Sequence, residues 1–148
     1  MSEINAPATL VTPAGTINFN PTSPATSYYW LTDVQGLDGV AVRLPIDDKP
    51  LADGGIVHDG LLGPRHVTIS GQVVYVDAAT RNNMCDALVA ALASIRAADG
   101  SLSWTPTGQA TKHLAAVRCD QPIIGFNGQG FAPKAFVFGL VAADPTIT

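Results

Sequence analysis

The chain closes with the stretch "KAFVFGLVAADPTIT", residues 134–148, and residues 135–143 within it carry no charged side chain. A short run this rich in Val and Phe is typical of a β-strand that is covered on both faces. Such a strand normally lies in the middle of a fold. We therefore expect neighbouring strands on both sides of it, and other layers of the protein above and below.

The clearest partner strand is "RHVTISGQVVYV", residues 65–76, in which apolar and polar residues alternate. Val67, Ile69, Val73 and Tyr75 are expected on one face of this strand and the polar residues on the other. Gly71 falls on the apolar face, which indicates a bulge or a close packing neighbour. Further short strands are expected over residues 27–34, 40–44, 101–104, 113–119 and 123–126.

One segment has helical periodicity, "DAATRNNMCDALVAALASIRAADG", residues 77–100. Asp77 is a candidate N-cap, Gly100 is a candidate stop, and Arg81 is expected off the apolar face. The apolar stripe consists of Met84, Leu88, Ala91, Leu92 and Ile95. Strands, then one helix, then more strands predict a mainly β fold, a β-sandwich or twisted barrel with one flanking α-helix.

The domain organisation is simple. Residues 1–27 are rich in Pro, Thr, Ala and Asn and are expected to form an N-terminal arm with one strand at residues 15–19. Residues 28–148 are long enough for a single domain with its own core. Residues 45–64 are rich in glycine and proline, and we expect no regular structure there. A segment of this length without regular structure is usually functional or flexible.

The composition disfavours several functions. The net charge is −4, from 8 basic and 12 acidic residues, and the basic residues form no run that would bind a phosphate backbone. No apolar run approaches the roughly 20 residues of a membrane helix, and no secretory signal is recognised at the N-terminus. Cys85 and Cys119 lie far apart in the sequence and are expected to be buried free thiols of a protein made in a reducing compartment.

We find no pattern of catalytic residues. The stretch "TPTGQATKH", residues 105–113, lacks the Gly-Lys-Ser/Thr ending of a phosphate-binding loop. His58 lies among several aspartates, and a solvated acidic loop is favoured there over a metal site. No catalytic, metal or cofactor residue is therefore assigned, and the chain is expected not to be an enzyme.

The aromatic residues Tyr28, Tyr29, Trp30 and Trp104 allow two interpretations. Aromatic side chains on strands mostly fill a β core, and this interpretation is favoured. Exposed aromatic rings also stack on sugars. A small carbohydrate-binding β-sandwich on a virion surface, acting through Trp30 or Trp104, is therefore the alternative function.

Five stretches in order carry a resemblance to a known family. They are "YYWLTDVQGLDGVAVR", "DGGIVHDG", "GPRHVTISGQV", the helical "LVAAL" and "FVFGLVAADP". Together they resemble the N-terminal domain of phage distal tail proteins (Dit), components of siphophage tails, from about residue 28 to residue 145. The resemblance implies a β-sandwich with a flanking helix, related to tail-tube proteins. Six copies would form a ring at the distal end of the tail tube, as the hub that joins the tube to the tail tip.

The resemblance also implies partners and a location. The partners would be other copies of the chain, the tail tube protein, the tail tip or baseplate proteins and the tape measure protein, with DNA only in passage and no membrane. The location would be the distal end of the virion tail, after synthesis in the host bacterial cytoplasm. Family members often continue into a lectin-like C-terminal domain, which we do not expect in this protein, so a related tail-tube or collar ring protein is a further alternative.

Two groups of residues are candidates for these roles. A channel for DNA is best served by a wall that does not bind phosphate, so the acids Asp47, Asp48, Asp53 and Asp59 are expected to face the lumen. The alternative is that they are ordinary solvated loop residues. A purely solvated loop would avoid leucine. The candidate oligomer interface is therefore Leu51, Leu61 and Leu62, whose burial would be repeated at every contact of a ring. The alternative is that these leucines pack into the subunit's own core.

Overall fold

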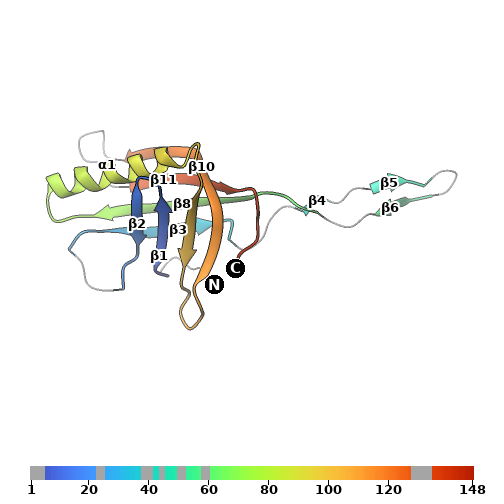
Figure 1. The fold of residues 1–148 in the computed structure, drawn as a ribbon, viewed down its shortest axis with the longest axis horizontal. Helices are drawn as coiled ribbons and strands as arrows, with labels where there is room; N and C mark the ends of the chain where they lie inside the picture. The colour runs from blue at the N-terminus through green and yellow to red at the C-terminus, as the bar shows by residue number, and fades with distance from the viewer. Residues whose placement is uncertain are drawn as a thin grey trace.

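The fold is mainly β with one helix, as the sequence predicts (Figure 1). The computed structural model describes residues 6–22, 26–37, 42–43, 46–49, 53–57, 61–127 and 135–148, with the backbone alone at 42–43, 46–48, 56–57, 61 and 122–127. The elements are β1 (Ala8–Thr12), β2 (Gly15–Phe19), β3 (Tyr28–Gln35), β4 (Val42–Arg43), β5 (Ile46–Asp48), β6 (Gly55–Val57), β7 (Leu61–Leu62), β8 (Arg65–Val74), α1 (Ala78–Ser94), β9 (Gly100–Trp104), β10 (Lys112–Asn127) and β11 (Ala135–Ala142).

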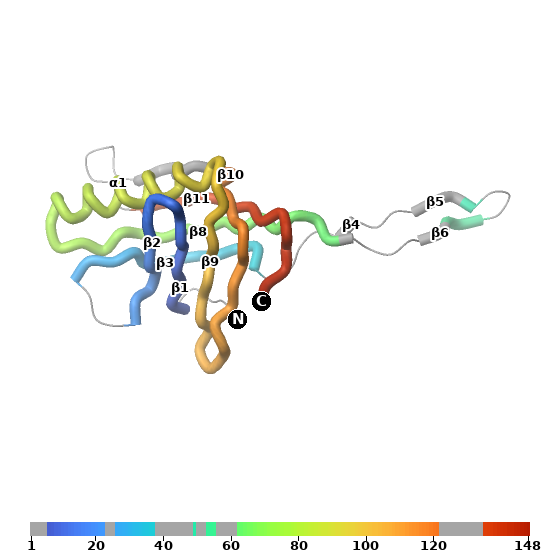
Figure 2. Tube along the Cα trace, in the orientation of Figure 1, coloured from blue at the N-terminus to red at the C-terminus, as the bar shows by residue number. Residues whose placement is uncertain are grey.

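Seven of these strands pair in a closed ring, in the order β1-β2-β3-β8-β11-β10-β9, and β9 pairs back to β1 (Figures 1 and 2). The pairing is antiparallel except between β2 and β3, which are parallel and meet where Phe19 lies opposite Tyr29. Strands in a closed ring have hydrogen-bonding neighbours on both sides. The barrel itself therefore offers no free sheet edge within the described residues.

The interior of the barrel is filled by alternate residues of the strands. On β11, Phe136, Phe138, Leu140 and Ala142 point inward and are at most 1% exposed. Phe136 stacks on Phe138 with ring centroids 5.8 Å apart, and Phe19 from β2 lies 6.3 Å from Phe138. Burying a side chain of this size stabilises the fold by roughly 1.5–3 kcal/mol, so this aromatic cluster is a major part of the core.

β11 is a central strand, as predicted, because it lies between β8 and β10. The expectation that it is covered on both faces is wrong. On its outer face Val137 is 38% exposed, and α1 packs on β10, β2, β8 and β1 rather than on β11. The outer positions are occupied by Val137, Gly139 and Val141, which are small or β-branched and suit a strand whose outer face is only partly covered.

The helix begins as predicted. Asp77 has an extended backbone, and its carboxylate accepts a hydrogen bond from the Thr80 amide at 2.8 Å, which lowers the pKa of Asp77. The apolar stripe is confirmed, since Leu88, Ala91, Leu92 and Ile95 are buried and Met84 is partly buried.

Arg81 was expected off the stripe, and this expectation is wrong, because the residue is only 9% exposed. Its guanidinium carbon lies 5.3 Å from the centre of the Tyr75 ring. A long aliphatic stem can lie along apolar surface, and a cation is attracted to an aromatic face. These two effects account for a basic residue within the buried face of the helix.

The expectation of an N-terminal arm over residues 1–27 is wrong for the residues that the structure describes. The strand at Gly15–Phe19 is present, but β1 precedes it, and both belong to the barrel. Leu10, on β1, is fully buried. The side chain of Asn20, at the end of β2, donates to the Ala6 carbonyl and accepts from the Leu31 amide at 2.9 Å. The polar and proline-rich composition therefore reflects the turns around these strands.

Near the C-terminus, the two strands expected over residues 113–119 and 123–126 are one bent strand, β10. Its pairing with β11 shifts register three times, beginning between Cys119 and Gln121. The polar residues at these irregularities resemble a loop in the sequence, which explains why one strand looks like two.

Candidate assembly site: a β-ribbon arm on the barrel

The strands β3 and β8 pair in the barrel, and the described strands between them in the sequence lie outside the barrel as a ribbon (Figure 1). In this ribbon β4 pairs with β7, and β5 pairs with β6 further out. Near its tip the Lys49 amide donates to the Gly54 carbonyl at 3.3 Å. We call the described residues between Val42 and Leu62 the arm. Its described strands extend away from the barrel (Figure 1).

The expectation of no regular structure over residues 45–64 is therefore wrong for the residues that the structure describes. The two ladders differ in register by one position, since Arg43 lies opposite Leu61 and Ile46 lies opposite Val57. A ribbon outside the barrel has no face on the core, so it need not show the alternation of apolar and polar residues that identifies β8. This explains why the sequence pattern did not indicate strands.

A two-stranded ribbon of this kind is marginally stable in water when it stands alone. Within the described residues each arm strand pairs with one other strand only, so each has an unpaired edge. Leu62 at the root of the arm is 55% exposed. Leu61 lies beside it in β7, with its side chain outside the description, and Leu51 lies outside the described residues. The unpaired strand edges are a template on which another protein chain can pair.

The four candidate lumen acids are all within or beside the arm in sequence. Asp47 and Asp48 are in β5, but the directions of their side chains are outside the description. Asp53 is exposed next to Gly54, and Asp59 lies outside the described residues, as does His58. Among the residues that the structure describes, no three His, Cys, Asp or Glu side chains gather as a metal site would require. A role for these acids in lining a channel stays a prediction.

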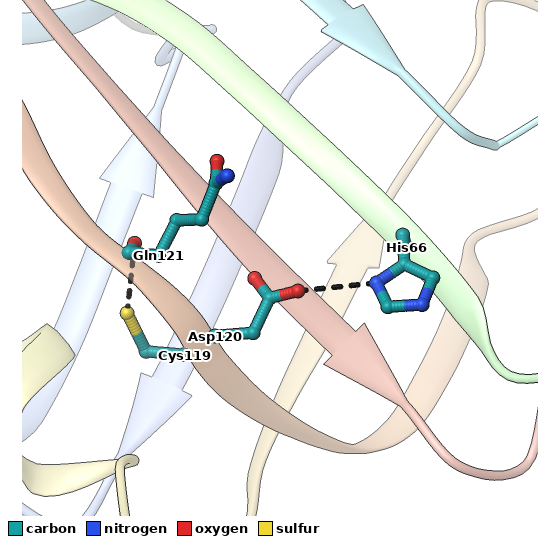
Figure 3. Close-up of polar contacts among 4 residues, drawn as sticks. All are labelled: His66, Cys119, Asp120 and Gln121. Atoms are coloured by element: carbon teal, nitrogen blue, oxygen red, sulfur yellow. Dashed lines mark hydrogen bonds and ion pairs between the residues drawn. The ribbon is translucent and has the colours of Figure 1, made fainter.

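An ion pair on the outer face of the barrel was not indicated by the sequence (Figure 3). Asp120 on β10 lies 3.1 Å, through Oδ2, from Nδ1 of His66 on β8. The two strands are separated by β11, and a Cβ added at Gly139 of β11 would meet Asp120 Oδ1 at 2.7 Å. Glycine at this position therefore lets the carboxylate cross β11. Exposed pairs of this kind contribute about 0–1 kcal/mol.

The aromatic residues divide between the two faces of the barrel wall. Trp104 is 4% exposed and lines an apolar pocket inside the barrel, which confirms the favoured interpretation of a core residue and rules out the alternative in which Trp104 offers its ring to a sugar. Its indole N–H has no acceptor within the described part of the chain. Trp30 is on the outer face and half-buried against Tyr28, with ring centroids 6.1 Å apart. Trp30 alone remains as the candidate of the carbohydrate alternative.

Neither cysteine forms a disulfide, as predicted, but the expected burial is confirmed for Cys85 only, since Cys119 is half-buried. Burial raises the pKa of both thiols, and the Asp120 carboxylate adds to the effect at Cys119. Raised pKa values disfavour the thiolate, which is the reactive form. No helix among the described residues has the length and hydropathy needed to cross a membrane.

The described residues therefore form a seven-stranded barrel with one flanking helix and a β-ribbon arm. No protein-family model matches the chain. No curated protein matches its sequence either.

Among solved structures, the chain is similar to the Dit protein of phage SPP1, whose crystal structure is described as a paradigm of the hub adsorption apparatus in phages that infect Gram-positive bacteria. The TM-score is 0.59 with 13% sequence identity, over 95% of this chain and 51% of the Dit chain. The chain has a Dit-like fold and spans about half the length of that protein. At this identity the likeness concerns the fold alone.

Proposed function

We propose that this protein is a structural component of a phage tail that forms a ring at the distal end of the tail tube and joins the tube to the tail tip. One observation carries the proposal: 95% of the chain superposes on a hub protein of a phage adsorption apparatus. The resemblance in the five sequence stretches points to the same class. The proposal assigns the protein to the virion and gives it no enzymatic activity.

We propose that the copies assemble through the arm rather than through the barrel strands. The closed ring of strands leaves no edge of its own for pairing in the described residues, whereas the arm has unpaired edges and an exposed Leu62. A contact between the arm of one copy and a different surface of the next copy is heterologous, and such contacts form a ring when the rotation from copy to copy closes. We propose six copies, with the tail tube, tail tip and tape measure proteins as neighbours and with DNA only passing through.

In this ring the acids Asp47, Asp48, Asp53 and Asp59 would face the lumen, where negative charge prevents DNA from binding to the wall. Replacing all four with Lys should slow DNA ejection while tails still assemble. Ejection can be followed by the fluorescence of a DNA dye after receptor is added to purified particles. Unchanged ejection kinetics in assembled mutant particles would remove these acids from the lumen.

The proposal is tested by the oligomeric state and the location of the protein. We expect rings in negative-stain electron microscopy, either from the purified protein or after mixing with the tail tube protein, and labelled copies at the distal end of the tail. A single copy per tail would overturn the ring. Label at the other end of the tail would favour the collar alternative.

The half-buried pair of Trp30 and Tyr28 on the outer face is the observation that keeps carbohydrate binding as a second candidate function. If a sugar ring stacks against Trp30, the intact protein should bind glycans on an array, and this binding should be lost in Trp30→Ala. A Tyr29→Phe variant, changed on the inner face, is the matched control. No glycan binding by the intact protein would exclude this candidate.

A further inference from the structure

We propose that Arg65 is a positioning residue that fixes the direction of the arm, by joining the root of the arm to the chain segment that follows β11. The proposal concerns a single copy of the protein and does not depend on the proposed ring. Its starting point is a buried arginine whose hydrogen bonds connect parts of the chain 29 and 80 residues away.

Arg65 is the first residue of β8, where the chain returns from the arm into the barrel, and it is 7% exposed. Its backbone is held in the barrel wall opposite Ala142 of β11. Nη1 donates to the Gly36 carbonyl at 2.7 Å, and Nε donates to the Pro145 carbonyl at 3.0 Å. One planar guanidinium therefore holds two carbonyl groups in fixed relative positions, which the rigid geometry of arginine favours.

Gly36 lies where the outgoing strand leaves the barrel toward the arm. Its φ of +96° is in the region that favours glycine, and a Cβ there would collide with the His66 carbonyl. The chain that leaves β3 at Gly36 therefore packs directly against the backbone of β8 beside Arg65. The hydrogen bond from Arg65 closes this contact, so both strands at the root of the arm are held by one side chain.

Pro145 connects this root to the C-terminal segment, which lies on the side of the barrel from which the arm leaves (Figure 2). The segment has a second attachment further on. Thr148 and His113 exchange two backbone hydrogen bonds, of 2.8 and 3.0 Å, and Ile147 pairs with Leu114 and packs against the core. Because these contacts fix the C-terminal segment, its Pro145 carbonyl can hold the Arg65 guanidinium in one orientation.

The two hydrogen bonds of Arg65 matter because its guanidinium is charged and buried. Within the described part of the chain no carboxylate lies in ion-pair distance of this guanidinium, so its desolvation is offset by the two carbonyl acceptors. If the C-terminal segment moves, Arg65 loses one acceptor and its orientation is no longer fixed. The arm root, held by the other bond, should then become less ordered.

The test measures the spread of distances between the arm and the barrel by double electron–electron resonance. Spin labels are placed at Lys49 in the arm and Val89 on α1, both exposed, in a chain carrying Cys85→Ala and Cys119→Ser. We expect a narrow distribution that becomes at least twofold wider in Arg65→Met. Arg65→Lys keeps the charge but lacks the planar fork, and should give an intermediate width.

Arg118→Met is the matched control, because Arg118 forms a surface pair with Asp99 at 2.7 Å and has no bond to the arm root. Its distribution should equal that of the unmodified protein. Thermal unfolding of every variant is measured in parallel. A loss of stability without a change in width would show that Arg65 is structural only, and would overturn the proposal.

The coupling to the C-terminal segment is tested with Ile147→Asn, which loosens the segment and leaves Arg65 in place. We expect it to widen the distribution when Arg65 is present and to add nothing when Arg65→Met is present. Independent, additive widening would overturn the coupling. If Arg65→Met does not fold, an unchanged width in Ile147→Asn and in Arg65→Lys would overturn the proposal by itself.

Discussion

The hydroxyl of Tyr29 on β3 donates a hydrogen bond of 2.7 Å to the main-chain oxygen of Met84 in α1, 55 residues away. This bond attaches the helix to the barrel wall beside the aromatic cluster, where Tyr29 also meets Phe19 edge-on at 5.9 Å. Burial, and to a lesser extent the Cys85 thiol, raises the pKa of Tyr29 to about 12. The hydrogen bond therefore links α1 to the barrel, and the ionisation of Tyr29 is coupled to folding.

Replacing Tyr29 with Phe should lower the free energy of unfolding by about 0.5–1.5 kcal/mol, the usual net value of one hydrogen bond. The change also alters the pH dependence. The folded protein keeps the Tyr29 proton up to about pH 12, whereas the unfolded chain loses it near pH 10. The stability that the neutral hydroxyl contributes is thus present below pH 10 and falls between pH 10 and 12.

Urea unfolding between pH 8 and 12 measures both effects. Tyr29→Phe should show a smaller decrease in stability above pH 10 than the unmodified protein. Tyr28→Phe is the control, since Tyr28 lies on the outer face, and its pH profile should match that of the unmodified protein. Identical profiles for both variants would contradict the assignment of the titration to Tyr29.

The double substitution Leu61→Asp with Leu62→Asp should prevent ring assembly and leave the single subunit folded. Leu62 is 55% exposed, so placing a charge there costs the monomer little. In an interface, each buried leucine would contribute roughly 1.5–3 kcal/mol, and the loss is repeated at every contact of the ring. Thermal unfolding reports on the monomer, and electron microscopy reports on the rings.

Val76→Asp and Val89→Asp are the controls for this substitution, since these valines are 63% and 48% exposed and lie outside the arm. Both should assemble normally. Normal rings from the leucine variant would show that the arm is not an assembly element. A lost melting transition would show instead that these leucines belong to the core of the subunit.

Two glycines of the barrel should respond differently to alanine. A Cβ at Gly71 would collide with the Trp30 carbonyl and lie 2.7 Å from Cζ of Phe136, both in the packed wall and core. Overpacking of this kind costs about 1–3 kcal/mol. At Gly139 the Cβ would meet the Asp120 carboxylate, which can swing away from His66.

Chemical unfolding should therefore show a larger loss of stability for Gly71→Ala than for Gly139→Ala. In Gly139→Ala the chemical shifts of the His66 ring should also move in NMR spectra, because its partner is displaced. Equal losses for the two variants would contradict the difference in packing between the inner and outer faces.

Both thiols should be free in the purified protein. Labelling after unfolding without reductant should count two modified cysteines. In the folded protein Cys119 should react first, because it is half-buried and Cys85 is 4% exposed. Both should react more slowly than a small thiol at pH 8, since burial raises the pKa of each. A mass that indicates a Cys85–Cys119 disulfide would overturn the expectation.

Local patterns in the sequence were sufficient for the main elements. The alternation along residues 65–76 predicted that Val67 and Ile69 point inward on β8, because successive side chains of a strand point to opposite faces. The apolar run at the C-terminus predicted a central strand, and Asp77 with the stripe on residues 84–95 predicted the helix. Each of these signals lies within a short segment whose period depends on the backbone alone.

The tertiary structure decided the contacts between distant segments. The closing of the barrel by β1 and β9, the ion pair of His66 with Asp120 and the bonds of Arg65 to Gly36 and Pro145 depend on which strands become neighbours. The arm has no core-facing side, so the hydrophobic pattern that identifies other strands does not apply to it. Strand order and register are set by the packing of the whole barrel, and a local period of two carries no information about them.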